Sequence, residues 1–390
     1  MPNIEFTANA ENPTNIKVIG VGGGGCNAVD RMISAGMRNV SFAAANTDLQ
    51  ALSYNSAPEK IQLGIQTTKG LGAGMDPEKG EKSAEEQTET LQKSLEKCDM
   101  LFITAGMGGG TGTGAAPVIA RIAKEMECLT VAVVTKPFSF EGSKKMDLAE
   151  KAIDKLVDNV DALITIPNEN LLQIVDKRLP MADCLKIADS VLMEGVRGIA
   201  DLITNHGMFN VDFADVRRIM ADKGNAVMGM ATVKGEQNAQ EIVEKLISNP
   251  LIEGGTIEGA SGMLINVTHG SEASLHELKA IVDVLSAKAD NNADIINGFV
   301  EEPGQEDEVR ITVIATGYRA AKPITRSKMF ESAAVETESS TDPYQSEYIE
   351  IDRKNSAQPV AADDYYEEEN EEEKEVMDEP YSGEEALKAA

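Results

Sequence analysis

Short apolar runs alternate with stretches of helical periodicity through the first half of the chain. The runs are rich in β-branched residues and lie at 15–21, 39–45, 99–105, 129–135 and 161–167. Between them, apolar residues recur at helical spacing over 26–36, 81–97, 115–127 and 146–158. Strands that alternate with helices in this way predict an α/β fold with a doubly wound, largely parallel sheet.

The segments that follow the predicted strands are rich in glycine. All strands of a parallel sheet end at the same edge, and open α/β sheets bind their ligands there. Two of these segments, GVGGGGCN at 20–27 and AGMGGGTGTG at 105–114, lead into predicted helices, and Pro117 is expected near the first turn of the second helix. A flexible linker would not connect a buried strand to a helix. Because helix N-termini with bare N–H groups favour anions, the pattern predicts an oligophosphate site.

A dinucleotide-binding oxidoreductase is the alternative for the first glycine segment. Gly20, Gly22 and Gly25 satisfy the spacing G-x-G-x-x-G after a predicted strand, and Asp48 follows about 20 residues later. The second, longer glycine segment and the lack of a His or Lys constellation for hydride transfer argue against this class. The chain also has no G-x-x-x-x-G-K-[ST] motif, so a phosphate-binding lysine of that kind is not expected.

Charge and composition exclude several classes of partner. The formal net charge of -29 argues against a nucleic-acid binder and against direct docking on anionic lipid. No run of 18 or more apolar residues occurs, so no membrane insertion is expected. The four cysteines form no CxxC pair, which favours a reducing, cytoplasmic location. The three histidines lack the spacing of metal ligands, and we assign no metal-ligating residue.

The acidic charge is concentrated toward the end of the chain. Residues 321–390 carry 7 Lys and Arg against 20 Asp and Glu, a net charge of -13, which leaves -16 for the preceding 320 residues. The run DDYYEEENEEEKE has almost nothing to bury, and the segment before it shows no hydrophobic periodicity. Such composition is typical of disorder, so folding is expected to stop near residue 320.

At GGGTGTG, residues 108–114, the sequence resembles the signature of the tubulin and FtsZ superfamily. The segments VIGVGGGGCNAVDRM, NTD, GLGAG, KPFSFEG and NVDFADVR are similar to FtsZ rather than to tubulin, over about residues 15–318. The resemblance implies a parallel, doubly wound GTPase domain joined by a long central helix to a smaller α+β C-terminal domain. The implied boundaries are a disordered N-terminus at 1–14, a GTP-binding domain at 15–178, the central helix at 179–206, a C-terminal domain with the catalytic loop at 207–318, and a disordered acidic linker and tail at 319–390.

The same resemblance implies a set of GTP-binding residues. Asn168 and Asp189 match the base-reading positions, and a carboxylate at Asp189 can accept hydrogen bonds from guanine that adenine cannot donate. Without the resemblance, Asp189 is interpreted as a solvated helix residue. Leu185 stands where an aromatic ring commonly stacks on the guanine. The implied GTP-binding residues are Gly23, Gly24, Gly25, Cys26, Asn27, Ala73, Gly74, Gly110, Thr111, Gly112, Glu141, Lys145, Asn168 and Asp189.

Two positions in this set invite a second interpretation. Lys145 stands where Arg is usual, which keeps the charge and loses the bidentate fork. Cys26 lies beside a predicted phosphate loop, where its thiol is either reactive or, as we favour, packed and inert.

Three residues form the implied catalytic set: Asn210, Asp212 and Asp215. Asp212 and Asp215 lie three residues apart, and on spacing alone they favour capping of a helix N-terminus. The resemblance implies instead that their loop enters the nucleotide pocket of the next subunit. Hydrolysis of GTP to GDP and phosphate would then depend on assembly, with Mg²⁺ at the triphosphate and the carboxylates polarising the attacking water.

The resemblance therefore implies a GTP-dependent, self-assembling cytoskeletal protein of the cell-division ring, located in the cytoplasm beneath the inner membrane at mid-cell. Its partners would be further copies of itself, head to tail, and membrane-anchoring and regulatory division proteins bound through the tail. The C-terminal MDEPYSGEEALKAA departs from the D-x-P-x-F-L type of adaptor peptide and matches only as DEPY. A GTP-binding scaffold without hydrolysis is the alternative function.

The acidic tail generates a first prediction. Limited proteolysis of the native protein should remove residues from about 321 onward while the preceding part stays intact, because a chain of this composition has no core to protect it. As a flexible tether of about 70 residues, the tail would span roughly 45 Å, more with self-repulsion. Resistance of the last 60 residues to protease would contradict this prediction.

Overall fold

The computed structural model of the chain describes residues 14–173, 178, 180–204, 211–234, 239–247, 257–270, 275–301 and 308–317. Several expectations fall outside these residues. They concern residues 1–13, the predicted catalytic Asn210, and the tail from residue 318 onward.

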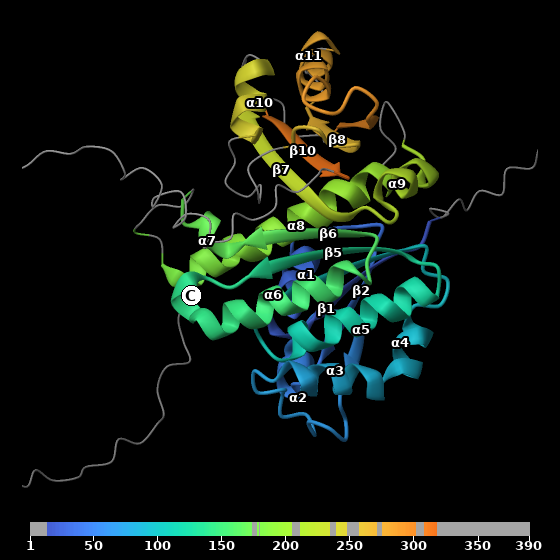
Figure 1. The fold of residues 1–390 in the computed structure, drawn as a ribbon, viewed down its shortest axis with the longest axis vertical. Coiled ribbons are helices and arrows are strands. Elements are labelled where there is room, and N and C mark those ends of the chain that lie inside the picture. The colour runs from blue at the N-terminus through green and yellow to red at the C-terminus, as the bar shows by residue number, and fades with distance from the viewer. Residues whose placement is uncertain are drawn as a thin grey trace, which may run out of the picture. The chain divides into compact units, whose positions relative to one another are not determined.

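Six parallel strands form the first part of a ten-stranded sheet, in the order β3-β2-β1-β4-β5-β6 (Figure 1). They are β1 (Ile16–Val21), β2 (Ser41–Asn46), β3 (Glu59–Gln62), β4 (Met100–Gly106), β5 (Leu129–Lys136) and β6 (Ala162–Pro167). The prediction of a doubly wound parallel sheet is confirmed. β3 was not predicted, because its sequence EKIQ places one buried apolar residue, Ile61, at the edge of the sheet.

Helices cover both faces of this sheet because alternate strand residues point to opposite sides. In β1, Ile16 and Val18 join one apolar cluster, and Ile19 and Val21 join the other. The first cluster packs against α1 (Gly22–Ser34), α2 (Leu49–Tyr54) and α8 (Met181–Thr204). The second packs against α3 (Pro77–Glu86), α4 (Thr88–Ser94), α5 (Thr111–Glu125) and α6 (Ser143–Val157). A short 3-10 turn, Ser139–Glu141, and α7 (Asn168–Leu171) follow β5 and β6.

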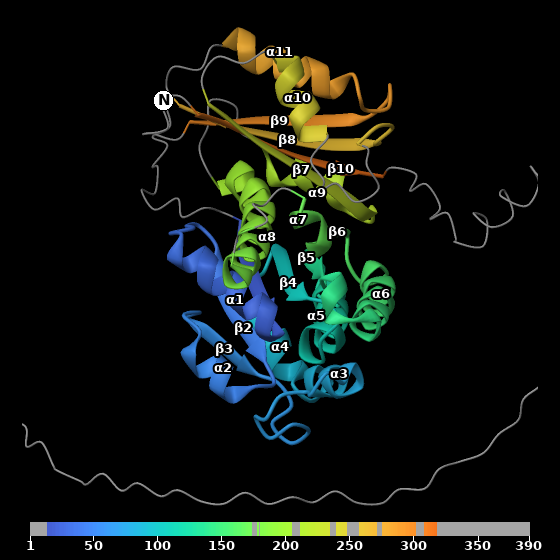
Figure 2. The same cartoon turned by 90° about the vertical axis from the view of Figure 1, so that its left-hand side faces the viewer.

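The second part of the sheet continues from β6 and changes strand direction. β7 (Gly224–Lys234) runs parallel to β6, β10 (Glu308–Thr316) is antiparallel to both β7 and β8 (Gly262–His269), and β9 (Asp294–Glu301) is parallel to β8. α10 (Ala239–Ile247) and α11 (Leu275–Ser286) cover one face of these strands (Figure 2). The opposite face of strands β7 to β10 packs against α8 and α9 (Phe213–Met220). This mixed arrangement agrees with the expected smaller α+β part.

The helices that follow the glycine segments begin earlier than predicted. α1 begins at Gly22, so the glycines at 22–25 lie in its first turn. α5 begins at Thr111, so only Gly112 and Gly114 of the second segment lie in a helix. In α5 the glycines serve helix packing, because a Cβ on Gly114 would lie 2.0 Å from the carbonyl oxygen of Pro77 in α3. Pro117 lies in the interior of α5, and its expected place near the first turn is wrong. The predicted helical stretch 81–97 is two helices, which meet at Gln87.

The first turn of α1 generates a matched pair of stability predictions. Gly25→Ala should destabilise the protein by about 1–3 kcal/mol, because its Cβ would lie 2.1 Å from the carbonyl oxygen of Thr104 in β4. Gly23→Ala is the control: no atom lies within 4 Å of its Cβ position, and alanine favours a helix over glycine by about 1 kcal/mol. Urea unfolding followed by circular dichroism measures both. Equal stabilities of the two variants would contradict the packing role of Gly25.

Candidate functional site

A cavity of about 270 Å³ opens where β1, β4, β5 and β6 end. It lies where the strand order reverses direction, between the neighbouring strands β1 and β4. α1 follows β1 in the chain, and α5 follows β4. Six of the predicted GTP-binding residues line it: Gly24, Asn27, Glu141, Lys145, Asn168 and Asp189. The other lining residues are Gly106, Met107, Gly108, Gly109, Thr135, Pro137, Leu185, Ala188 and Leu192.

The N-termini of α1 and α5 lie next to residues that line the cavity, Gly24 and Asn27 in α1 and Gly106 to Gly109 before α5. No side chain of the described residues caps either helix, so first-turn N–H groups remain available to a bound group. A Cβ added to Gly23, Gly74 or Gly109 would have no protein atom within 4 Å, leaving aside the adjacent residues. These positions leave room for a ligand to approach the backbone. The arrangement fits an oligophosphate held by N–H groups and helix dipoles.

Not every glycine of the predicted set has this free space. A Cβ on Gly25 would meet Thr104, and a Cβ on Gly112 would lie 2.8 Å from the carbonyl oxygen of Gly106. Gly110 is packed against the segment that carries Ala73, with Asp76 N 2.9 Å from its Cβ position. These glycines allow backbone segments to approach each other, so they shape the cavity without lining it.

Cys26 is packed and inert, as favoured from the sequence. Its thiol is buried and lies 3.6 Å from the carbonyl oxygen of Gly20. Burial, with a smaller contribution from the nearby Asp30 carboxylate, raises the pKa of Cys26 to about 12. The thiol is therefore protonated at neutral pH, and it does not line the cavity.

The end of the cavity between α7 and α8 carries polar groups suited to a planar base. Asn168, at the start of α7, is buried, and its Oδ1 atom has no hydrogen-bond partner among the described residues. Asp189 of α8 is half-buried beside it, and the Leu185 side chain covers the same wall. An unpaired buried oxygen and a nearby carboxylate fit a ligand edge that donates several hydrogen bonds.

Arg31 of α1 is a residue of this region that the sequence analysis missed. Its Nη2 atom lies 3.4 Å from Oδ2 of Asp189 and forms an ion pair with it. Burial raises the pKa of Asp189, and the Arg31 charge opposes that rise. The pair holds the carboxylate in position against the cavity. No sequence signal links these residues, because 158 positions separate them.

Glu141 and Lys145 form an ion pair of 2.9 Å at another wall of the cavity. The Glu141 carboxylate also accepts a hydrogen bond of 3.0 Å from the backbone N–H of Phe138, which fixes the 3-10 turn after β5. Both side chains remain partly exposed and accessible to a ligand. The positive charge of Lys145 therefore lies at the cavity wall, where Glu141 partly neutralises it.

Thr111 and the loops after β2 and β3 form a layer next to the cavity. The hydroxyls of Thr111 and Thr47 lie 2.6 Å apart. Asp48 forms an isolated bridge with Leu71, and its side chain caps α2 by accepting a 3.0 Å hydrogen bond from Ala51 N. The cap hydrogen bond engages Oδ1 of Asp48, the carboxylate that the oxidoreductase alternative would assign to a ribose.

The two predicted catalytic aspartates lie at the opposite edge of the sheet from the cavity. Arg217 of α9 donates hydrogen bonds to the carbonyl oxygens of Asp99, 3.5 Å away, and Glu127, 3.4 Å away. Asp99 and Glu127 come just before β4 and β5 in the chain. The cavity is lined instead by residues at the ends of those strands and after them. Asp212 and Asp215 flank the start of α9 and therefore lie at the amino edge.

The local geometry of these aspartates differs from the capping interpretation. Asp212 occupies the N-cap position of α9, but within the described residues its exposed side chain forms no cap hydrogen bond. Asp215 forms an ion pair of 3.6 Å with Arg218 on the same helix. The Asp212 carboxylate is thus free of a capping contact. Asn210 lies outside the described residues.

The described residues provide neither a cluster of metal ligands nor a membrane-spanning helix. No group of three or more His, Cys, Asp or Glu side chains is arranged to hold a metal ion in this part of the chain. None of its helices combines the length and apolar character needed to cross a bilayer.

The Arg31–Asp189 pair generates a prediction about proton binding. Arg31→Met should raise the pKa of Asp189 further, because burial would remain and the opposing positive charge would be lost. Arg38→Met is the matched control, since Arg38 is exposed in the turn after α1 and does not line the cavity. NMR titration of aspartate carboxyl carbons measures the pKa in each variant. An unchanged or lowered pKa of Asp189 in Arg31→Met would contradict the assignment.

Comparison with known proteins agrees with this architecture. Residues 15–176 match the GTPase domain of the Tubulin/FtsZ family, and residues 224–319 match the C-terminal domain of the FtsZ family. An FtsZ dimer from M. jannaschii, solved empty, is 41% identical with a TM-score of 0.74, and the match covers 78% of this chain and 88% of that one. A point mutant of the same FtsZ is 40% identical with a TM-score of 0.74, covering 78% and 91%.

A more distant structure shares the fold alone. CetZ2 from Haloferax volcanii, solved as a GTPgS-bound protofilament, is 18% identical with a TM-score of 0.66, covering 82% of this chain and 97% of that one. The FtsZ matches span both the GTPase and the C-terminal domain. The chain belongs to the FtsZ family and carries the GTPase domain of the tubulin and FtsZ proteins.

Proposed function

We propose that the protein binds GTP in the cavity at the carboxyl edge of its sheet and hydrolyses it with carboxylates from the next subunit of a head-to-tail filament. The observation that carries the proposal is the separation of the two halves of the site. The cavity lies at one edge of the parallel strands, and Asp212 and Asp215 lie at the other.

Distance supports action between subunits. α8 extends about 22 Å from Asp189, which lines the cavity, to its last residue, Thr204, at a rise of about 1.5 Å per residue. The segment with Asp212 follows α8 in the chain and does not return to the cavity, because Arg217 anchors α9 at the amino edge. A second copy stacked in the same orientation would bring its amino edge to the first copy's cavity. Repetition of this contact generates an open filament.

Exposed apolar side chains support a docking surface beside the cavity. Leu71 is 87% exposed, and Leu49, Met75 and Phe140 are also exposed, in the connections that follow β2, β3 and β5. Large exposed apolar side chains near a polar site favour contact with another protein surface. In the proposal, this surface receives the amino edge of the next copy. Self-association of this kind agrees with the solved relatives, which are an FtsZ dimer and a CetZ2 protofilament.

The cavity residues would divide the work of holding GTP. The first turns of α1 and α5 donate N–H groups to the phosphates, and Lys145 adds a positive charge. Asp189 accepts hydrogen bonds from the N1–H and amino group of guanine, which adenine cannot provide in the same pattern. Asn168 offers its unpaired oxygen to the same edge. The remaining predicted binding residues, Gly23 to Asn27, Ala73, Gly74, Gly110 to Gly112 and Glu141, shape or line this cradle.

Mg²⁺ fits this site as part of a Mg–GTP complex. Mg²⁺ keeps several waters and binds one or two protein oxygens together with phosphates, so it does not need an all-protein cluster. When bound, it would neutralise charge on the triphosphate. The described residues provide Thr111, whose hydroxyl lies at the start of α5, as an oxygen near the phosphates. The proposal assigns no carboxylate of this chain to the ion.

The carboxylates of the next subunit would act on the attacking water. The uncapped Asp212 side chain can accept a proton or a hydrogen bond from that water, while Asp215 is held by Arg218 on α9. Asn210 belongs to the same proposed loop. We assign no arginine finger, and turnover is therefore expected to be slow, on the order of a fraction of a turnover per second.

In the cell, the proposed filament would form the division ring in the cytoplasm beneath the inner membrane at mid-cell. Membrane-anchoring and regulatory division proteins would bind the tail, residues 319–390. The proposed organisation has a GTP-binding domain at 15–178, a central helix at 179–206 that contains α8, Met181–Thr204, and a C-terminal domain at 207–318. A GTP-binding filament scaffold without hydrolysis is distinguished from this proposal by phosphate release.

Titration of a variant into the wild-type protein tests action between subunits. Asp212→Ala alone should bind GTP nearly as well as wild type and lose about 10²-fold or more in turnover, because the attacking water loses its polarising partner. Added to wild type, it should lower hydrolysis per wild-type pocket, because each variant subunit leaves a neighbour's GTP without its carboxylate. Phosphate release in mixed filaments gives the measurement.

A matched charge removal controls this titration. Glu244→Ala removes an exposed carboxylate on α10, away from α9, and should leave hydrolysis unchanged at every mixing ratio. Mixed filaments are verified by a labelled Asp212→Ala subunit that sediments with wild type. A constant rate per wild-type pocket in such filaments would show that Asp212 does not act on a neighbouring subunit.

A further inference from the structure

Two of the four cysteines lie together at the amino edge of the sheet. Cys98 lies two residues before β4 and Cys128 directly before β5, and these strands are neighbours. A backbone hydrogen bond of 3.0 Å from Leu129 N to Asp99 O joins the two segments between the cysteines. Both side chains belong to the same apolar cluster. Met100 pairs with Leu129, so Cys98 and Cys128 are offset by one residue in this register. A strand spacing of about 4.8 Å and a rise of about 3.3 Å give a Cα separation of roughly 6 Å, which a disulfide allows.

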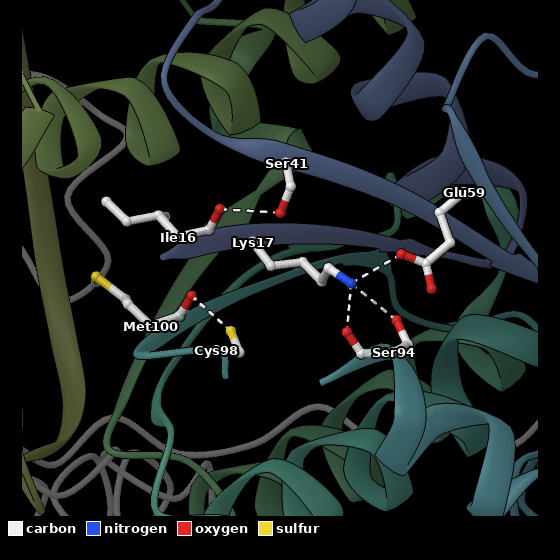
Figure 3. Close-up of polar contacts among 7 residues, drawn as sticks. All are labelled: Ile16, Lys17, Ser41, Glu59, Ser94, Cys98 and Met100. Atoms are coloured by element: carbon white, nitrogen blue, oxygen red, sulfur yellow. Dashed lines mark hydrogen bonds and ion pairs between the residues drawn. The ribbon is translucent and has the colours of Figure 1, made fainter. Parts of the chain in front are cut away.

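The surroundings of Cys98 include a fixed positive charge. Lys17 of β1 lies next to it, with its Nζ atom 2.8 Å from Glu59 Oε2 and 3.0 Å from Ser94 Oγ, and it also donates to the Ser94 carbonyl oxygen (Figure 3). The Cys98 thiol donates to the carbonyl oxygen of Met100 at 3.1 Å, which fixes the sulfur beside β4 (Figure 3). Cys98 is partly exposed, whereas Cys128 is buried.

The two thiols differ in acidity. The neighbouring Cys128 thiol lowers the pKa of Cys98, against the effect of burial, and the Lys17 charge lowers it further. The Cys98 thiol, together with burial, raises the pKa of Cys128. The partly exposed Cys98 is thus the more acidic thiol of the pair, and the buried Cys128 is the less acidic one. This is the arrangement of an attacking and a resolving cysteine.

We propose that Cys98 and Cys128 form a peroxide-reactive dithiol that closes reversibly to a disulfide at the amino edge of the sheet. The Cys98 thiolate attacks one oxygen of a hydroperoxide, the O–O bond breaks, and the departing oxygen leaves as hydroxide or alkoxide and takes up a proton. Cys98 is then a sulfenic acid. The Cys128 sulfur attacks the Cys98 sulfur, and the hydroxyl leaves with the Cys128 proton as water. Two thiols and one hydroperoxide give one disulfide, one water and one water or alcohol.

The remaining cysteines lack this arrangement. Cys26 is buried with its pKa raised to about 12, which disfavours its thiolate. Cys184 lies alone on α8, and no second cysteine is near it in the chain. Oxidation is therefore directed to the Cys98–Cys128 pair.

The disulfide would also act on α9, an effect that rests on the proposed function. Arg217 donates to the carbonyl oxygens of Asp99 and Glu127, the residues adjacent to Cys98 and Cys128. Its guanidinium lies over the ring of Phe213, 5.3 Å from the centroid, and so connects this edge to the start of α9. Closing the disulfide draws the two segments together and shifts both carbonyl oxygens. Asp212 and Asp215 would move with α9, away from the neighbouring subunit's GTP.

Mass spectrometry of the full-length protein tests the dithiol without reference to activity. The reduced protein is treated with a few equivalents of hydrogen peroxide, denatured and alkylated. The expected result is two alkylated cysteines in place of the four in the sequence, a linked Cys98–Cys128 peptide, and full recovery with dithiothreitol. In Cys128→Ala, a dimedone adduct should appear on Cys98, because the sulfenic acid has no resolving partner.

Two further variants complete this test. Cys184→Ser is the matched control and should form the Cys98–Cys128 link at the wild-type rate. Lys17→Met, verified as folded by circular dichroism, should oxidise more slowly because the nearby charge is lost. Oxidation of Cys26 or Cys184 before Cys98, or links mainly between chains, would overturn the proposal.

A second measurement separates this inference from the proposed function. Oxidised wild type should retain GTP affinity and lose about 5-fold or more in hydrolysis, the usual lower range of coupling between sites, while Cys98→Ser should be insensitive to peroxide. A disulfide that forms without loss of hydrolysis would overturn the effect through Arg217. Absence of GTP hydrolysis in the reduced wild type would contradict the proposed function, and the mass measurement would still decide on the dithiol.

Discussion

The parallel direction of six adjacent strands is the constraint on which the rest of the structure depends. Because β1 to β6 point the same way, every connection that ends a strand lies at one edge and every connection that begins a strand lies at the other. The first turn of α1 and the segment that leads into α5 therefore line the same cavity. α9 and the Cys98–Cys128 pair are restricted to the opposite edge by the same geometry.

Close backbone packing makes this arrangement possible. α1 lies against β4 at Gly25, where a side chain would collide with Thr104, and α5 lies against α3 at Gly114. The glycines thus have two physical roles. Some let backbones approach each other, and others, such as Gly23 and Gly109, leave space in front of N–H groups. Both roles place first-turn N–H groups around the cavity, so packing and ligand binding are linked through the same segments.

The sequence predicts most of the parallel sheet because its central strands are buried on both faces and therefore have continuous apolar runs. It does not reveal β3, whose EKIQ sequence has one buried apolar residue. The starts of α1 and α5 were placed too late because glycine-rich first turns carry no apolar periodicity. The break at Gln87 between α3 and α4 has no glycine or proline to mark it.

The candidate site was predictable where a local motif exists and hidden where a contact is long-range. Asn168, Asp189 and Lys145 came from the family resemblance, and they line one cavity in the structure. Arg31 has no motif, and its role depends on α1 packing against α8. The separation of Asp212 from the cavity depends on strand direction and on Arg217, which spacing alone does not reveal.

Dependence of GTP hydrolysis on protein concentration tests the central claim most directly. Phosphate release per subunit is measured at saturating GTP across a dilution series that spans filament formation, with assembly followed by light scattering. If the catalytic carboxylates act on a neighbouring subunit, the rate per subunit falls toward zero on dilution and rises with the fraction assembled. A rate per subunit that stays constant while filaments dissociate would show that one chain completes the site alone, and would contradict the account.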